Sequence, residues 1–144
     1  MSAQLFYRVV KAELTQFATL TSSFVPTAQY AQRNEFLLSF IPAESVLSCS
    51  FSVIVQDADN NPIMKAEMVC GFEFKKDSLE AITQEGKVSF PVNIVSHIVS
   101  LTYSSMRGAI SVKSEDTPLR GFVLPLTNVN EHIKSPVAFT IEAI

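Results

Sequence analysis

The sequence predicts an α+β fold: a curved antiparallel sheet of four to five strands with one long helix packed on one face. Two observations carry this prediction. Apolar and polar residues alternate with a period of two in several separate runs, which is typical of strands with one buried face. Residues 91–112 instead repeat their apolar positions at helical spacing. The length of 144 residues fits a single domain, residues 1–144.

The composition argues against several classes of protein. Hydrophobic residues make up 47% of the chain, so disorder is not expected, and no apolar run is long enough to span a membrane. The 11 Lys and Arg against 14 Asp and Glu leave no positive surface for nucleic acid. The first residues lack the basic and apolar regions of a signal peptide, so the expected compartment is the cytoplasm.

The low charge is itself informative. Charged residues make up 17% of the chain, whereas an ordinary soluble domain carries about 25%. Either other copies of the chain cover part of the surface, or an apolar surface stays open for a client, or both. The alternative is a weakly charged surface on a monomer.

An N-terminal strand is expected over residues 5–20. Its alternation slips at Val9 and Val10, as a β-bulge would cause. Residues 21–32 then form a connection with apolar side chains that the pattern does not order: Phe24, Val25 and Tyr30. The next strand, over residues 34–41, places three apolar side chains on one face: Phe36, Leu38 and Phe40.

Two long alternating runs flank the turn cluster DADNNP at residues 57–62 and predict an antiparallel hairpin over residues 46–74. Both apolar faces must point to the same core, so opposed residues have an odd index sum. A turn centred on Asp59 and Asn60 then places Cys49 opposite Cys70. In a reducing cytoplasm these cysteines are expected to be buried free thiols and not a disulfide.

Two short elements complete the pattern. Asp77 and Glu80 have the spacing of an N-cap and its reciprocal carboxylate, which predicts a short helix through about Thr83 that Gly86 ends. After the breaker pair Ser135–Pro136, a final strand is expected to bury alternate side chains: Val137, Phe139 and Ile141.

The long helix is expected over residues 91–112, with Pro91 at its first position. A helix on one sheet needs an apolar arc of only about 100°, and the arc here is nearly twice as wide. A second apolar stripe therefore needs its own partner, and the same helix of another subunit is the simplest one. The alternative is coverage by residues 118–130 of the same chain. The predicted subunit interface consists of Ile94, Ile98, Leu101, Ser105 and Ala109.

No catalytic or metal-binding pattern is recognisable. The sequence lacks a GxSxG elbow and the glycine-rich loops that cradle phosphates. His97 and His132 lie too far from the two cysteines to predict a zinc site. The acidic turn at Asp57, Asp59 and Asn60 lacks the downstream ligands of a calcium loop. We therefore expect no enzyme, no cofactor and no metal.

Three motifs follow one another in a recognisable order: CGFEF at the end of the hairpin, SFPVNIVSHIVSLTYSSMRG in the long helix, and TPLRGFVLPLTNV after it. In this order they resemble the SecB-like chaperone family over residues 34–130. The residues that carry the resemblance are Gly71, Phe72, Phe90, Pro91, Ser105, Arg107, Gly108, Leu124, Pro125, Asn128 and Val129.

The resemblance implies a cytosolic, ATP-independent holdase that binds unfolded polypeptides along apolar grooves. It also implies a homo-dimer or homo-tetramer with long helices sandwiched between sheets. The partner in the cell would be a translocation motor, to which secretory precursors are delivered, or the antitoxin of a toxin–antitoxin pair. The expected groove residues are Phe36, Leu38, Phe40, Leu119, Phe122, Leu124 and Leu126.

Some alternatives stay open. The three strand residues of this set would also serve as ordinary core, and the chain could be a structural or interaction protein that self-assembles on the same fold without chaperone activity. The sequence also departs from the family. Family members close with a second helix, whereas here Ser135–Pro136 and a predicted strand follow, and the acidic surface and tail that engage the motor are not evident.

Overall fold

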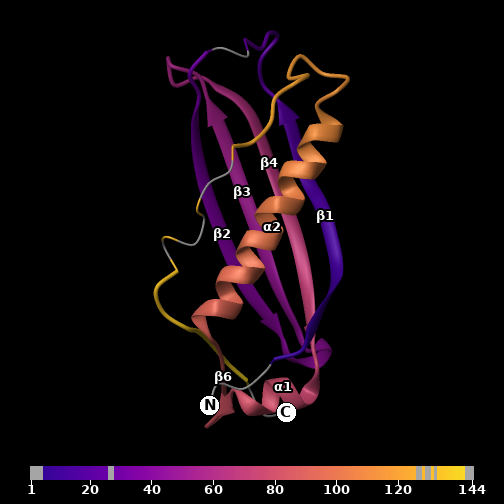
Figure 1. Cartoon of the computed structure of the whole chain (residues 1–144), viewed down its shortest axis with the longest axis vertical. Helices are drawn as coiled ribbons and strands as arrows, with labels where there is room; N and C mark the ends of the chain where they lie inside the picture. Colours follow the sequence, from indigo (N-terminus) through magenta and orange to yellow (C-terminus); the bar gives the residue numbers. More distant parts are fainter. Residues whose placement is uncertain (1–4, 26–27, 126–127, 129–130, 132, 142–144) are drawn as a thin grey trace.

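The computed structural model describes residues 5–25, 28–125, 128, 131 and 133–141. Four long antiparallel strands form the main sheet, in the spatial order β1-β4-β3-β2. This confirms the predicted antiparallel sheet. The order was not predicted: the N-terminal strand lies at one edge and the second strand at the other (Figure 1). The strands are β1 (Tyr7–Thr19), β2 (Ala31–Ile41), β3 (Val46–Gln56) and β4 (Pro62–Phe74).

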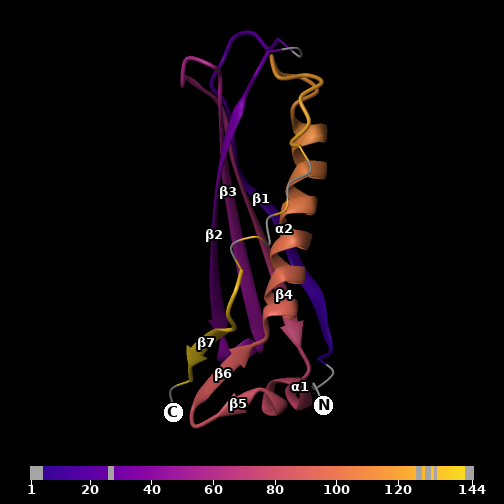
Figure 2. The same cartoon turned by 60° about the vertical axis from the view of Figure 1, so that its left-hand side comes forward.

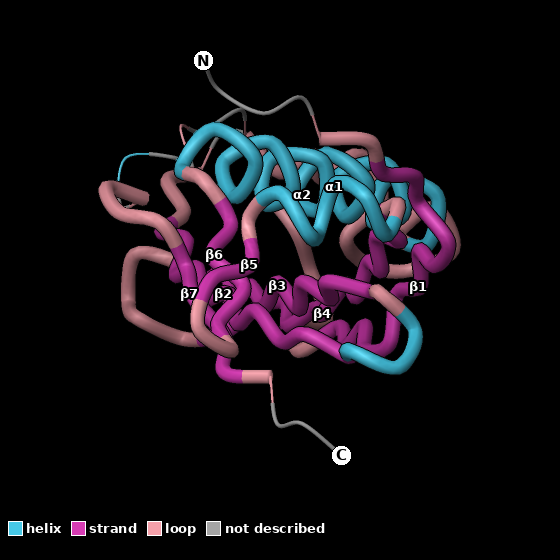
Figure 3. The backbone as a smooth tube through the Cα atoms, turned by 90° about the horizontal axis from the view of Figure 1, so that it is seen from below, coloured by secondary structure: helices cyan, strands magenta, loops and turns pink. Residues whose placement is uncertain are grey.

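The long helix α2 (Val92–Lys113) lies along one face of the main sheet, so the molecule has two layers when it is seen from one end (Figure 3). The short elements gather at the lower end, where β5, β6 and β7 form a second sheet in that order (Figure 2). They are η1 (Pro42–Glu44), α1 (Lys76–Ala81), β5 (Thr83–Gln84), β6 (Lys87–Phe90) and β7 (Val137–Thr140). β7 confirms the predicted final strand.

Strand β1 contains the predicted bulge. Its register against β4 shifts between Val9 and Lys11, and a second shift between Leu14 and Gln16 was not predicted. After the first shift Lys11 faces Gly71, where an added Cβ would lie 3.3 Å from the Lys11 Cβ. A glycine therefore lets β1 approach β4 closely beside the bulge.

The register of the β3–β4 hairpin also confirms the prediction, because Cys49 lies directly opposite Cys70. Both residues are buried free thiols. The turn between the strands is closed by Asp57, whose carboxylate accepts the backbone N–H groups of Asp59 and Asn61, both at 2.9 Å. Local side-chain chemistry thus fixes the hairpin register.

The start of α1 differs from the prediction. Lys75 and not Asp77 is the N-cap, and no side-chain cap bond forms among the described residues. The backbone N–H of Phe6 donates to the Ser78 hydroxyl at 2.9 Å, and the Lys75 N–H donates to the Phe6 carbonyl at 3.0 Å. The residue that precedes β1 therefore positions this helix, and a local capping pattern does not reveal such a contact.

The role predicted for Gly86 is also wrong, since it does not end the helix. Glu85 and Gly86 both have positive φ, at 52° and 77°, and form the turn between β5 and β6. Positive φ at both central residues is typical of the tight two-residue turn that joins the strands of a β-hairpin. Glycine is common both at helix ends and in hairpin turns, so its presence alone does not identify which of the two it forms.

Helix α2 lies within one residue of its predicted bounds, with Pro91 as the N-cap instead of the first helical residue. Its sheet-facing side is completely buried at Val95, Val99, Met106 and Ile110. Among the described residues no helix is long and apolar enough to cross a membrane.

The paired cysteines allow a test of this core. Burial raises the pKa of Cys49 to about 11, and it also raises the pKa of Cys70. At pH 8 a thiol with a pKa near 11 is only about 0.1% thiolate, against about a quarter for an ordinary cysteine. We expect a chromogenic disulfide reagent to leave both thiols unmodified in the native protein and to titrate both in denaturant. Rapid native labelling at pH 8 would contradict the buried pair.

Candidate functional site

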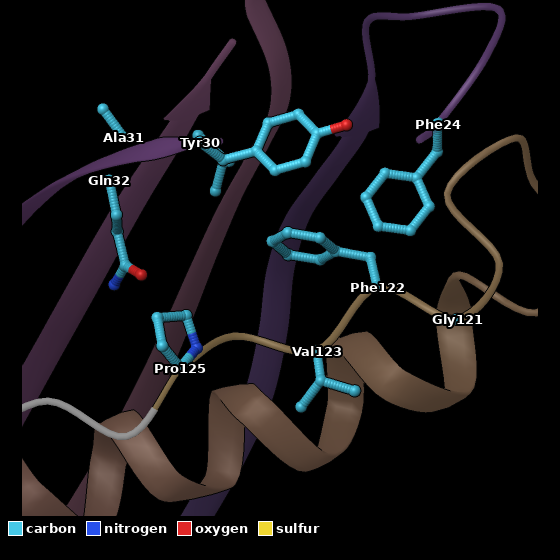
Figure 4. Close-up of a pocket in the computed structure, with 9 residues that line it drawn as sticks. Phe24, Tyr30, Ala31, Gln32, Gly121, Phe122, Val123 and Pro125 are labelled. Carbon is cyan, nitrogen blue, oxygen red and sulfur yellow. The ribbon is translucent and has the colours of Figure 1, made fainter. Parts of the chain in front are cut away.

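An open pocket of about 370 Å³ lies at the upper end of the molecule, at the end of α2 away from β6 (Figures 1 and 4). It is bounded by the β1–β2 connection, the start of β2 and the crossover segment, which we define as residues 114–125. The lining residues are Phe24, Tyr30, Ala31, Gln32, Val55, Gly121, Phe122, Val123 and Pro125.

Three aromatic rings form the wall of this pocket. Phe24 stacks on Tyr30 with ring centroids 5.6 Å apart, and Phe122 meets Phe24 edge-on, also at 5.6 Å. Figure 4 shows the three rings turned toward one another. The Tyr30 hydroxyl donates to the Val25 carbonyl at 2.8 Å. This bond holds the backbone of the β1–β2 connection against the Tyr30 side chain.

The crossover segment has a defined backbone. The Thr117 hydroxyl accepts the Leu119 N–H at 3.1 Å, and the Phe122 N–H donates to the Leu119 carbonyl at 2.8 Å. Gly121 lies at φ +87°, a left-handed conformation that glycine adopts without strain. This turn directs the Phe122 ring toward the pocket (Figure 4).

Helix α2 holds the crossover segment through two side chains. Arg107 Nε donates to the Leu124 carbonyl at 2.8 Å, and the Tyr103 hydroxyl donates to the Pro125 carbonyl at 2.7 Å. Both bonds satisfy backbone carbonyls in a segment that has no strand partner within the described sheets. The apolar segment is thus attached to the helix through polar groups.

The polar end of the pocket is the amide of Gln32. Its Nε2 donates to the Tyr103 hydroxyl at 3.0 Å and to Asn34 Oδ1 at 2.6 Å. Its Oε1 is buried and accepts no hydrogen bond from any described residue. Burial raises the pKa of Tyr103, although the Gln32 bond acts in the opposite direction. Tyr103 therefore stays a neutral donor.

The structure places the predicted crossover residues differently from the expectation. Leu119 and Leu124 are completely buried in the core of their own chain, and Phe122 is 7% exposed. Only Phe122 of these three lines the pocket. Side chains alternate between inside and outside along this segment, so the outward Val123, 55% exposed, lies at the surface instead. Leu126 lies outside the described residues.

The three predicted strand residues are half-buried on the inner face of β2 and pack against the core. The Phe36 ring stacks on the Phe51 ring with centroids 6.2 Å apart, and the ring centroids of Phe40 and Phe90 are 5.5 Å apart. Neither these two residues nor Leu38 line the aromatic pocket. Their role in client binding stays a prediction, and their packing matches the alternative of ordinary core.

Of the predicted interface residues, Ile98 must be reassigned. It is completely buried within its own chain, because α2 contacts β1 as well as β3 and β4 on a sheet four strands wide. Ser105 is exposed, and its hydroxyl donates back to the Leu101 carbonyl at 2.8 Å. The remaining members are half-buried: Ile94, Leu101 and Ala109.

Sequence reasoning missed much of the pocket. Phe24 and Tyr30 lie in a connection without periodicity, and Gln32 begins the next strand. The one available signal was the presence of two aromatic residues in an otherwise small and polar loop. It did not indicate that both would meet Phe122, about ninety residues later in the chain.

No protein-family model and no curated protein sequence matches the chain. Solved structures do match it. One is the SecB-like chaperone Rv1957 of Mycobacterium tuberculosis, in complex with a ChAD peptide from the Rv1956 HigA1 antitoxin. The two folds superimpose with a TM-score of 0.56 over 84% of this chain and 87% of that chain, at 12% identity. The present chain therefore has a fold similar to that of a SecB-like chaperone.

The bond network around Gln32 can be tested with Tyr103→Phe. Removal of this hydroxyl takes away the donor to the Pro125 carbonyl and one of the two acceptors of the Gln32 amide, so we expect the free energy of unfolding to fall by about 1–2 kcal/mol. Tyr30→Phe is the control, because its hydroxyl contacts an exposed backbone, and we expect a smaller loss. Equal losses in urea titrations would contradict the proposed anchoring role of Tyr103.

Proposed function

We propose that this protein is an ATP-independent chaperone that holds unfolded or extended polypeptides, with the aromatic pocket as an anchor for client side chains. The observation that carries the proposal is the cluster of three aromatic rings that lines an open pocket beside the start of the outer strand β2. Such a site suits a chain that offers apolar side chains together with backbone N–H groups.

The size of the pocket supports an apolar side chain as ligand. Ligand pockets usually measure about 300–1,000 Å³, and this one is at the lower end of that range. A buried aromatic side chain removes about 150–250 Å² from water, which corresponds to about 4–6 kcal/mol before ordering costs are subtracted. This is sufficient for reversible capture without nucleotide hydrolysis.

The backbone of the client has potential partners as well. β2 is the outermost strand on its side of the main sheet, and Ala31 and Gln32 at its start line the pocket. An outer strand presents backbone donors and acceptors that an extended peptide can pair with. Backbone pairing carries no sequence information, so it suits a protein with many clients.

The lining of the pocket favours binding over catalysis. None of its nine described residues carries a carboxylate, an imidazole, an amine or a thiol. The one group of this lining with acid–base or nucleophilic capacity is the Tyr30 hydroxyl, which donates to the Val25 carbonyl. We therefore propose a binding protein and not an enzyme.

The structural neighbour supports a polypeptide as the ligand, because Rv1957 was solved with an antitoxin peptide. For the present chain we propose clients of the same kind: unfolded precursors for export or a dedicated antitoxin, in the cytoplasm. The two buried free cysteines agree with a reducing compartment.

The pocket is tested with Val123→Glu. Val123 lies exposed at the pocket, so a carboxylate there should disfavour apolar side chains of the client. We expect binding of fluorescently labelled, reduced and carboxymethylated lactalbumin to weaken about tenfold. The free energy of unfolding should stay within about 0.5 kcal/mol of the wild-type value. Val112→Glu is the matched control, because Val112 is 69% exposed and lies outside the pocket. Equal effects of both variants would refute the pocket as the anchor.

The holdase function is tested separately with the wild-type protein. Without ATP and at stoichiometric amounts, it should suppress the aggregation of a slow-folding denatured enzyme as followed by light scattering. Unchanged aggregation would contradict the holdase function itself and would leave the alternative, a protein that only self-assembles on this fold.

We also propose a homo-dimer or homo-tetramer with α2 at the interface. Leu101 is half-buried in the single chain, and a charge buried there against a second copy would be unpaired. Leu101→Glu should lower the mass measured by sedimentation while far-UV circular dichroism still reports a folded chain. Ser104→Glu, at an exposed position of the same helix, is the control. An unchanged mass for Leu101→Glu would place the interface elsewhere.

A further inference from the structure

The second sheet carries an apolar site that the chain itself occupies. β7 pairs antiparallel with β6, with Phe139 opposite Val88 and Val137 opposite Phe90. The Ile141 N–H extends the ladder to the Gly86 carbonyl at 2.7 Å. This site lies at the opposite end of α2 from the aromatic pocket (Figures 1 and 2).

The side chains of β7 cover an aromatic cluster. The Phe139 ring lies 5.9 Å from Phe90 and 6.0 Å from Phe40, measured between centroids. Phe90 in turn lies 5.2 Å from Phe74 in β4. Phe90 and Phe74 are buried, whereas Phe139 is only half-buried. Phe139 therefore forms the outer layer of a cluster whose inner layer belongs to the rigid part of the fold.

β7 is held by few interactions. It has four residues and is the outer strand of its sheet. Its inward residues Val137 and Phe139, like Ile141 after it, are half-buried, and its outward residues Ala138 and Thr140 are exposed. Short outer segments with little buried area open at low free-energy cost, well below that of global unfolding.

We infer that the edge of β6, together with Phe40 and Phe90, is a second binding site for extended polypeptides, and that β7 is an internal occupant which a client segment displaces. The inference rests on the proposed function for the nature of the client. The sequence of β7 indicates which client segments fit the β6 site: extended segments with apolar side chains at alternate positions and an aromatic residue in the middle.

Exchange of this kind needs no new structure. A client strand added to β6 would form the same backbone bonds that β7 forms now, and strand addition of this type is a recurrent mode of peptide recognition. Because the site is open only while β7 is undocked, the apparent affinity for a client equals the intrinsic affinity multiplied by the open fraction. Docked β7 thus lowers the apparent affinity of every client by the same factor, so only segments with a high intrinsic affinity for β6 bind.

The test is a reversible tether. Ser89 and Ala138 lie directly opposite each other in the ladder, and their side chains line a polar pocket away from the aromatic cluster. Opposed residues on neighbouring strands lie close enough for a disulfide, so the double variant Ser89→Cys and Ala138→Cys should lock β7 onto β6 when oxidised. The native cysteines are buried and do not compete.

The probe is the fluorescein-labelled heptapeptide SPVAFTI, the sequence of residues 135–141, measured by fluorescence anisotropy. We expect the reduced double variant to bind it at least about tenfold more tightly than the oxidised form. The same peptide with Ala in place of Phe should bind neither form measurably. Equal affinity in both redox states, or equal binding of the Ala peptide, would overturn the inference.

A second variant covers the case in which the tether distorts the strand. Phe139→Ala removes the ring that holds β7 on Phe40 and Phe90, so it should raise the affinity for SPVAFTI severalfold over wild type through a larger open fraction. Unchanged affinity would count against displacement. Disulfide-linked dimers of the double variant on a non-reducing gel would assign the occupant to a second copy, which also overturns it.

Failure of the inference and failure of the proposed function are distinguishable. If the oxidised tether leaves peptide binding unchanged while the wild type still suppresses aggregation, the holdase function stands and the β6 site does not. If the tether controls SPVAFTI binding but the wild type holds no denatured enzyme, the β6 site stands and the holdase function fails.

Discussion

The packing of α2 on the main sheet is the interaction on which the rest of the structure depends. Val95, Val99 and Met106 are completely buried there, where α2 contacts β1, β3 and β4. The same helix joins the two candidate binding regions. It begins two residues after Phe90 of the aromatic cluster, and Tyr103 near its middle holds the crossover segment.

The two regions are built from the same physical parts. Each has aromatic rings packed on the core, an outer strand with backbone groups at its edge, and half-exposed apolar side chains. They differ in occupancy. The upper pocket is open, whereas the lower site is filled by β7 of the same chain.

The similarity to a SecB-like chaperone at 12% identity shows how few residues this fold prescribes. Alternation in the strands and one broad apolar helix are sufficient for the two-layer arrangement, since burial depends on pattern more than on residue identity. In the present chain β7 packs on β6, and this strand occupies the lower site.

The sequence alone determined the features that depend on near neighbours: the Cys49–Cys70 register, the bulge after Val9 and the bounds of α2. Periodicity and turn chemistry are local, so they are readable without coordinates. Only the tertiary structure decided that β1 pairs with β4, that Ile98 is core, and that Phe24 meets Phe122. These contacts join residues far apart in the chain, and many partners of similar size and polarity satisfy the same local pattern, so the three-dimensional packing makes the choice.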